Sequence, residues 1–156
     1  MVKRVCACVV LLGAVACGGS SNTAPTPTQA NITVTLSPNP VTATNCSPTL
    51  CQGLDALFQF RADGTLTIQE TAGIGGNVNS ITRTFPTPAT VHDAQILQRS
   101  GTNHVPARGS LIFPLWVFTG AANDPNVPRQ FVFPFVVQFT DDRGNQLTGT
   151  AQWSVK

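Results

Sequence analysis

Alternation of apolar and polar residues dominates the chain after residue 30. In residues 56–70 the even positions are almost all apolar and the odd positions almost all polar. A period of two places successive side chains on opposite faces of a strand. Asp63-Gly64 is typical of a two-residue hairpin turn, but such a turn would send Phe60 and Leu66 to opposite faces. The unbroken alternation therefore predicts one long strand, with a bulge or a bend at Gly64.

The same pattern recurs along the rest of the chain, and no window gives a helical apolar period of ten or more residues. Pro38 and Pro40 interrupt the first apolar segment, which indicates an edge strand that stops or switches there. Gly, Pro, Asn and Asp separate the segments, as expected for turns. About seven strands are predicted, which favours an all-β sandwich. Besides residues 56–70, the predicted strands are residues 31–36, 77–85, 110–119, 130–140 and 146–155, with a short strand near 94–98.

Two short segments resemble parts of bacterial immunoglobulin-like modules. They are the opening residues 35–41, Thr-Leu-Ser-Pro-Asn-Pro-Val, and the closing turn at residues 140–145, Thr-Asp-Asp-Arg-Gly-Asn. The resemblance implies an immunoglobulin-like antiparallel β-sandwich of about seven strands, which we expect over residues 30–156.

The segment at residues 110–119 is apolar on both of its faces, whereas a sandwich strand normally shows one face to water. Either residues 86–109 cover the second face, or Ile112, Trp116 and Phe118 form a surface for a partner. Pro114 and Pro134 each remove a backbone donor, so we expect their strands to lie at sheet edges or to carry bulges.

The N-terminus combines a positive start with a short apolar run. Lys3 and Arg4 precede apolar or small residues at positions 5–16, followed by Cys17. Twelve helical residues cover about 18 Å, which is too short for a hydrocarbon core of roughly 30 Å, so the run indicates an export signal. Residues 14–17, Ala-Val-Ala-Cys, resemble the lipobox of bacterial lipoproteins, although Ala14 departs from the preferred Leu.

This resemblance implies cleavage before Cys17 and attachment of a lipid to its thiol. The chain then divides into a signal peptide (1–16), a lipidated flexible tether rich in Gly, Ser, Thr and Pro (17–29) and the sandwich domain (30–156). Gly18 after the cysteine resembles the sorting pattern for the outer membrane, where the host has two membranes. The alternative is an ordinary secretory signal cut after Ala16, since Ala14 and Ala16 also satisfy the A-x-A rule.

Two cysteines remain in the exported domain. Cys46 and Cys51 flank a Pro-containing turn, and an exported protein enters an oxidising compartment. We therefore predict a structural disulfide between them. The spacing is not the C-x-x-C of redox-active pairs, and a zinc site would need two more ligands nearby.

Charge argues against a nucleic-acid partner. Without Lys3 and Arg4, the basic residues number seven and equal the seven acidic ones. They are scattered along the chain, so no basic stripe tracks a phosphate backbone.

Candidate catalytic and metal-binding groups are few. His92 and His104 are the only histidines, and a triad of Ser100, His104 and Asp93 is framed by no nucleophile motif. Calcium binding by Asp141, Asp142 and Asn145 is the alternative to a simple turn, but the calcium-loop pattern is absent. We therefore predict that the protein is not an enzyme and has no metal or cofactor.

The expected function is a lipid-anchored cell-envelope protein with a non-catalytic binding or scaffolding module. The alternative is an accessory subunit of an envelope assembly that docks a protein partner through Ile112, Trp116 and Phe118. A remote alternative is a hydrolase that uses residues 86–109. The ligand and the pathway are not readable from the sequence.

Overall fold

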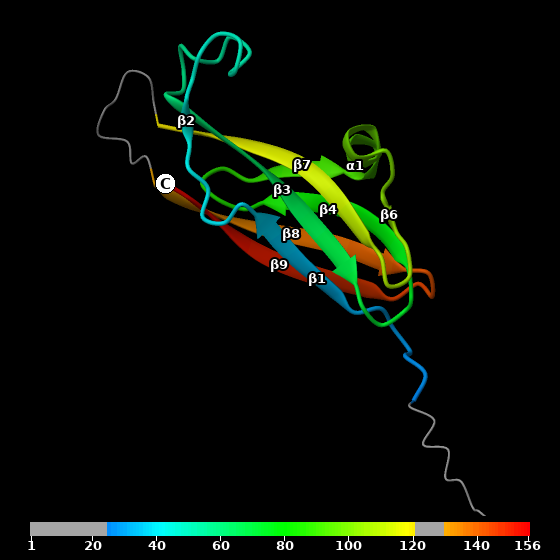
Figure 1. Ribbon diagram of the computed structural model, residues 1–156. Coiled ribbons are helices and arrows are strands. Elements are labelled where there is room, and N and C mark those ends of the chain that lie inside the picture. The colour runs from blue at the N-terminus through cyan, green and yellow to red at the C-terminus, as the bar shows by residue number, and fades with distance from the viewer. Residues whose placement is uncertain (1–24, 121–129) are drawn as a thin grey trace, which may run out of the picture.

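The computed structural model describes residues 25–120 and 130–156. These residues form two antiparallel sheets packed face to face, with one helix beside them (Figure 1). Seven strands have four or more residues, and two have only two residues. In chain order the elements are β1 (Ile32–Ser37), β2 (Thr44–Asn45), β3 (Phe60–Glu70), β4 (Gly76–Arg83), β5 (Ala89–His92), α1 (Asp93–Ser100), β6 (His104–Val105), β7 (Ser110–Thr119), β8 (Phe131–Asp141) and β9 (Gln146–Val155).

The hydrogen-bond order defines the two layers. In the first sheet β3 is central and pairs with β1, β2 and β7. Since β7 pairs along almost the whole of β3, β1 and β2 share the opposite side. In the second sheet β4 and β8 are central, with β9 at one edge and β5 and β6 at the other. The predicted immunoglobulin-like antiparallel β-sandwich is confirmed.

The apolar positions of the alternating segments form the core between the layers. The even positions of β3 lie on its inner side, and Ala62, Leu66 and Ile68 are fully buried. On β7 and β8 the odd positions point inward. The largest fully buried side chain is Trp153 of β9, whose indole N–H donates to the carbonyl of Pro38 at 2.7 Å. The alternation of apolar and polar positions therefore predicted the inner faces correctly.

The long strand is shorter at its start than the alternation predicted. β3 begins at Phe60 because residues 54–58 form a turn in which the N–H of Phe58 donates to the carbonyl of Leu54. No bulge occurs at Gly64, since the β3–β7 register runs through it without a shift. Glycine is required there for space: a Cβ would lie 2.6 Å from the Trp153 ring.

The first strand switches sheets after its prolines, as predicted. β1 pairs with β3, and beyond Pro40 the chain crosses to the second sheet, where Val41 pairs in parallel with Val155. The N–H of Val41 donates to the carbonyl of Ser154, and the N–H of Lys156 donates to the carbonyl of Val41. The segment that follows β1 is thus hydrogen-bonded to the C-terminal end of β9.

The short strand expected near residues 94–98 is wrong, because these residues lie in helix α1. Asp93 stands in the first turn and Arg99 in the last, where each complements the helix dipole. Gly101 ends the helix in the left-handed conformation with φ 75°. Ile96 is its one buried residue, so eight residues with a single anchor gave no helical period to detect. None of the described helical residues forms a span long and apolar enough to cross a membrane.

The two strand prolines behave differently. Pro114 lies on β7, an edge strand, as predicted. The N–H of Glu70 donates to the carbonyl of Gly109, so bonded and non-bonded pairs alternate along β3–β7 and the Thr65–Pro114 pair is non-bonded. The nitrogen of Pro114 therefore faces the free edge. For Pro134 the expectation of an edge or bulge is wrong, since β8 is central and its register with β9 is unbroken.

Pro134 is tolerated in β8 because of where its neighbour ends. Its carbonyl accepts from the N–H of Thr84, one residue beyond the end of β4. The missing N–H of Pro134 therefore faces the side on which β4 terminates, and only the last bond of that ladder is lost.

Candidate functional site

The predicted structural disulfide is present, and the predicted lipidation residue lies outside the described residues. Cys46 and Cys51 are bonded with their Cα atoms 5.5 Å apart. Cys17 precedes residue 25, so nothing in the structure bears on it. Figure 1 places the disulfide loop at the end of the sandwich opposite the N-terminal segment. The disulfide is thus structural reinforcement of the far end.

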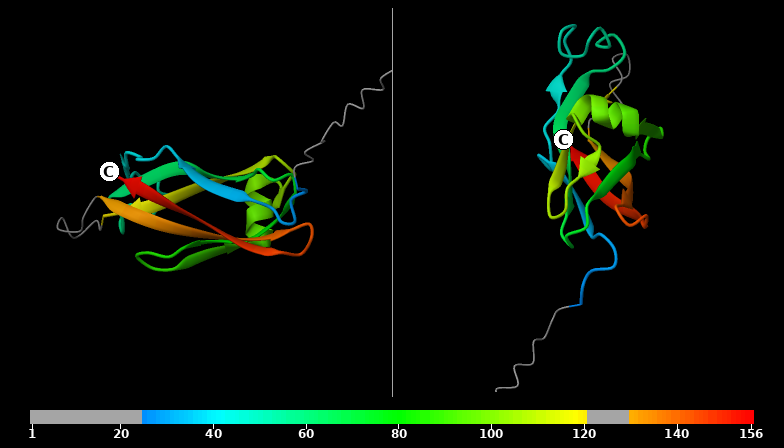
Figure 2. Two further views of the ribbon diagram at one scale, coloured as in Figure 1. Left: turned by 90° about the horizontal axis from the view of Figure 1, so that it is seen from below. Right: turned by 90° about the vertical axis from the view of Figure 1, so that its right-hand side faces the viewer.

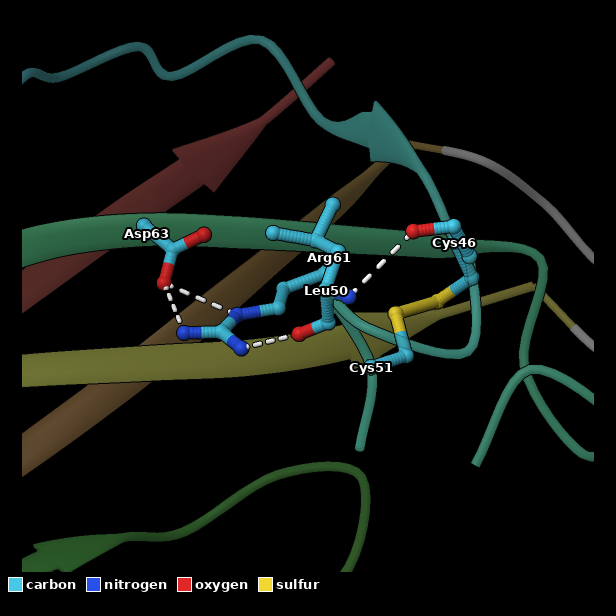
Figure 3. Close-up of a disulfide and its surroundings, with 6 residues drawn as sticks. Cys46, Leu50, Cys51, Arg61 and Asp63 are labelled. Carbon is cyan, nitrogen blue, oxygen red and sulfur yellow. Dashed lines mark hydrogen bonds and ion pairs between the residues drawn. A yellow bond between two sulfur atoms is a disulfide. The ribbon is translucent and has the colours of Figure 1, made fainter. Parts of the chain in front are cut away.

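Arg61 of β3 joins the disulfide loop to the outer face of the first sheet (Figure 3). Its guanidinium donates to the carbonyl of Leu50 and pairs with Asp63, with a 2.9 Å bond from Nε to Oδ1. The guanidinium carbon also lies 5.4 Å from the ring centre of Trp116. The loop is therefore fixed to the strand that neighbours the predicted partner surface.

The predicted partner surface is exposed in two of its three residues. Ile112 is 58% exposed and Trp116 is 37% exposed on the outward side of β7. Phe118 is half-buried because it stacks on Phe58, with ring centres 5.2 Å apart. Residues 86–109 pack at the edge of β7 through α1 and leave Ile112 uncovered. Internal cover of this face was therefore the wrong alternative for Ile112.

The candidate triad of Ser100, His104 and Asp93 is not connected. His104 Nδ1 lies 3.3 Å from the amide oxygen of Asn77, and the Asp93 carboxylate accepts from the N–H of Ala94 at 2.8 Å. The hydroxyl of Ser100 is buried without a hydrogen-bond partner among the described residues. No relay from carboxylate to imidazole to hydroxyl is assembled in this part of the chain.

Asp141, one of the candidate calcium ligands, is engaged by its own turn. It accepts from the N–H groups of Ala30, Arg143 and Asn145 at 3.0, 3.0 and 2.8 Å, and from the side-chain amide of Asn145 at 2.9 Å. Burial alone would raise the pKa of Asp141, but these donors lower it from 3.8 to about 2. Within residues 25–120 and 130–156 no three His, Cys, Asp or Glu residues gather as metal ligands.

Glu70 is a second buried carboxylate at the same end. It is 1% exposed and accepts from four backbone N–H groups: those of Asn31, Ala72, Gly73 and Arg108, at 3.2, 2.7, 2.8 and 2.8 Å. Burial opposes ionisation, but the four bonds outweigh it and lower the pKa of Glu70. Together, Glu70 and Asp141 hold the residues at which the chain enters the sandwich.

A pocket that the sequence did not reveal opens between the two sheets on the side of α1. It encloses about 90 Å³ and is lined by apolar residues of β4, β5, β7 and β8, together with Arg83 and Arg99. Figure 2 shows α1 between the edges of the two sheets, and α1 contacts β4, β5 and β7. The helix that was predicted as a strand therefore supplies one wall of the pocket.

Arg83 is one of the two charged residues that line the pocket. In the structure it follows Ile81 on the inner face of β4, and its half-buried guanidinium lies 5.8 Å from the Phe133 ring. Nη2 donates to the carbonyl of Thr87 at 3.2 Å, whereas Nε is buried without a partner among the described residues. The only signal in the sequence was a charged residue at a position that the alternation predicts to point inward.

No family model matches the chain, and no curated protein is detectably similar to it. Its function must therefore be inferred from its own residues and geometry.

Proposed function

We propose that the protein is a lipid-anchored component of the bacterial cell envelope whose sandwich is a non-catalytic binding module. The anchor is the thiol of Cys17, within the lipobox-like residues 14–17. Support for the arrangement comes from the entry point of the domain, since Ala30 and Asn31 are held by two buried carboxylates. A tether that is clamped at one end of the sandwich presents the opposite end, with the disulfide loop, away from the membrane (Figure 1).

The binding role is carried by one observation, the exposed apolar row on β7. Ile112 and Trp116 point outward from a strand whose inward residues already fill the core. An apolar row beside the polar face of β3 favours contact with another molecule. Because the free edge of β7 has the Pro114 nitrogen and α1 beside it, addition of a further strand is disfavoured. Contact would therefore use side chains.

A second candidate function is that of an accessory subunit that docks an envelope protein through this row. It is favoured by the 58% exposure of Ile112, which makes no contribution to the pocket or to the core. Phe118, half-buried where it stacks on Phe58, contributes less to such a contact than the sequence suggested.

Anchoring is tested by cell fractionation. The full chain is expected in membranes, and Cys17→Ser is expected in the soluble exported fraction, because each buried CH₂ of an acyl chain contributes about 0.8 kcal/mol to attachment. Cys46→Ser is the matched control, since it removes a cysteine and leaves the anchor. Membrane retention of Cys17→Ser would refute the anchor.

Docking through β7 is tested by cross-linking in cells. We expect Ile112→Ser to abolish a cross-linked species that persists in Thr35→Ser, a change on the polar part of the same outer face. If the same species forms equally with Ile112→Ser and Trp116→Ser, this face is not the docking surface.

A further inference from the structure

The pocket beside α1 contains positive charge without negative charge. Of the residues that line it, only Arg83 and Arg99 are charged. In the part of the chain that is described, the one ion pair joins Arg61 to Asp63, outside this pocket. Two guanidinium groups therefore share a site in which no carboxylate neutralises them.

The two arginines reach the pocket from opposite sides. Arg83 comes from the inner face of β4, where burial lowers its pKa. Arg99 comes from the last turn of α1, and its guanidinium carbon lies 4.6 Å from the Trp116 ring and 5.6 Å from the Phe113 ring. Aromatic faces orient a guanidinium without consuming its N–H donors. Both side chains thus keep donors for a further acceptor.

Holding Arg83 in this position has an energetic cost. A buried charge requires a partner, and a buried N–H without an acceptor destabilises the folded state. The Thr87 carbonyl satisfies one nitrogen, and Nε remains unpaired among the described residues. A hydrophobic residue at position 83 would fill the same inner-face position without this cost. An arginine at position 83 is therefore suited to bind an acceptor group of a ligand.

The other residues that line the pocket indicate the chemistry of the rest of a bound ligand. Ile81, Val91, Phe113, Leu115 and Phe135 present only apolar atoms. The space of about 90 Å³ exceeds the roughly 10–15 Å³ that one water requires. Hydrocarbon placed there would gain about 25 cal/mol per Å² of buried apolar surface.

We propose that this pocket binds a small amphipathic anion, with a carboxylate or phosphate head group on Arg83 and Arg99 and an apolar body against the inner strand faces. Guanidinium binds both head groups through paired N–H donors. The inference rests on the proposed binding function and names a ligand class for it. Trp116 belongs both to the pocket and to the docking row, but Ile112 belongs to the row alone, so substitution of Ile112 tests docking separately.

Calorimetry with defined probes tests the ligand class. The full chain carrying Cys17→Ser is titrated with decanoate, decyl phosphate, decanol and decylamine, since this variant cannot be acylated at position 17 whatever the native anchor is. We expect at least one of the two anions to bind, and decanol and decylamine to bind at least about tenfold more weakly. Equal binding of decanol, or no binding of either anion, overturns the proposal.

Substitutions test the two arginines. We expect Arg83→Gln and Arg99→Gln each to weaken anion binding about tenfold, since each removes a charged hydrogen-bond donor from the anion. Arg108→Gln, which removes an exposed guanidinium outside the pocket, should leave affinity unchanged. If Arg83→Gln does not fold, the exposed Arg99 still provides the test. Unchanged affinity in Arg99→Gln and in folded Arg83→Gln, or equal loss in Arg108→Gln, overturns the site.

Fluorescence tests the location. Trp116 lines the pocket, and Trp153 is fully buried in the core. We expect 11-bromoundecanoate to quench the emission of Trp116 when it binds. In the Trp116→Phe variant, where Trp153 is the remaining tryptophan, we expect no quenching. Equal quenching in Trp116→Phe would place the ligand elsewhere and overturn the proposal. None of the three experiments involves the membrane or Ile112, so their failure is distinct from failure of the anchor in Cys17→Ser or of docking in Ile112→Ser.

Discussion

Two regions of the sandwich contain charged side chains, and they differ in how far those charges are paired. At the entry end, Glu70 and Asp141 are nearly inaccessible, and backbone N–H groups surround both carboxylates. At the open side, Arg83 and Arg99 line an apolar pocket with no carboxylate. A carboxylate that the fold satisfies stabilises the fold, whereas a guanidinium that it leaves unsatisfied is available to a ligand. The comparison separates structural charge from candidate functional charge.

Acid should affect the entry end first and most strongly. A carboxyl with a lowered folded pKa contributes stability above its unfolded pKa, and this contribution is lost as the pH falls to the folded pKa. For Asp141 the window runs from 3.8 down to about 2. Glu70, whose pKa is also lowered, loses its contribution as it is protonated in acid. We expect the melting temperature to be constant near neutrality and to fall steeply through this window, as followed by circular dichroism.

Asp141→Asn provides the control for the acid experiment. It lacks the titrating group, so its melting temperature should start lower and depend less on pH between 3.8 and about 2. Parallel curves for the two proteins would show that Asp141 does not couple folding to pH.

Glu70→Gln should have the largest effect among single substitutions at neutral pH. The amide keeps the shape of the side chain but turns an NH₂ toward two of the four N–H groups that Glu70 binds. We expect the melting temperature to fall by about 10 °C. Gln69→Ala, on the exposed neighbour in the same strand, should change it by less than about 2 °C. A shift in Glu70→Gln as small as the control's would contradict the role assigned to this carboxylate.

Arg83→Met should instead raise the melting temperature. It replaces an unpaired, half-buried guanidinium with an apolar chain facing Ile81 and Phe133, so we expect the melting temperature to rise by about 3 °C. Calorimetric unfolding measures the change. A clear loss of stability would mean that Arg83 supports the fold, and the contrast between the two regions would then disappear.

Arg99→Gln should lower the stability only modestly. The side chain is exposed, and its contacts with Trp116 and Phe113 are worth roughly 0.5–1 kcal/mol each at exposed sites. We expect a fall of no more than about 4 °C in melting temperature. A much larger fall would indicate that α1 depends on these contacts to remain docked.

Local pattern predicted most of the strands. The alternation in β3, β7, β8 and β9 located their inner faces, and the Pro38–Pro40 interruption marked the change of sheet. The Pro-containing turn between Cys46 and Cys51, five positions apart, was sufficient to predict their bond. These features depend on neighbouring residues, so they can be read without knowledge of the fold.

Other features were misread because they depend on distant residues. Residues 93–100 contain one buried apolar side chain, and so short a helix depends on contact with β4, β5 and β7 in addition to its end residues. Gly64 suggested a bulge, but its true constraint is the Trp153 ring from the other sheet. Pro134 suggested an edge, but the end of β4 beside it removes the need for its N–H.

The sequence by itself determined the two-residue period of the domain, its disulfide and the lipobox-like start that predicts an anchor. The tertiary structure decided which charges are satisfied. Glu70 accepts from four N–H donors, and Arg83 has no carboxylate beside it in the pocket. Both facts depend on which loops and strand edges the sandwich brings together. Hydrogen bonds and ion pairs act over a few ångströms in space, while hydrogen-bonded partners here are separated by up to 117 residues in the chain. That separation is why the pocket beside α1 was not predicted from the sequence.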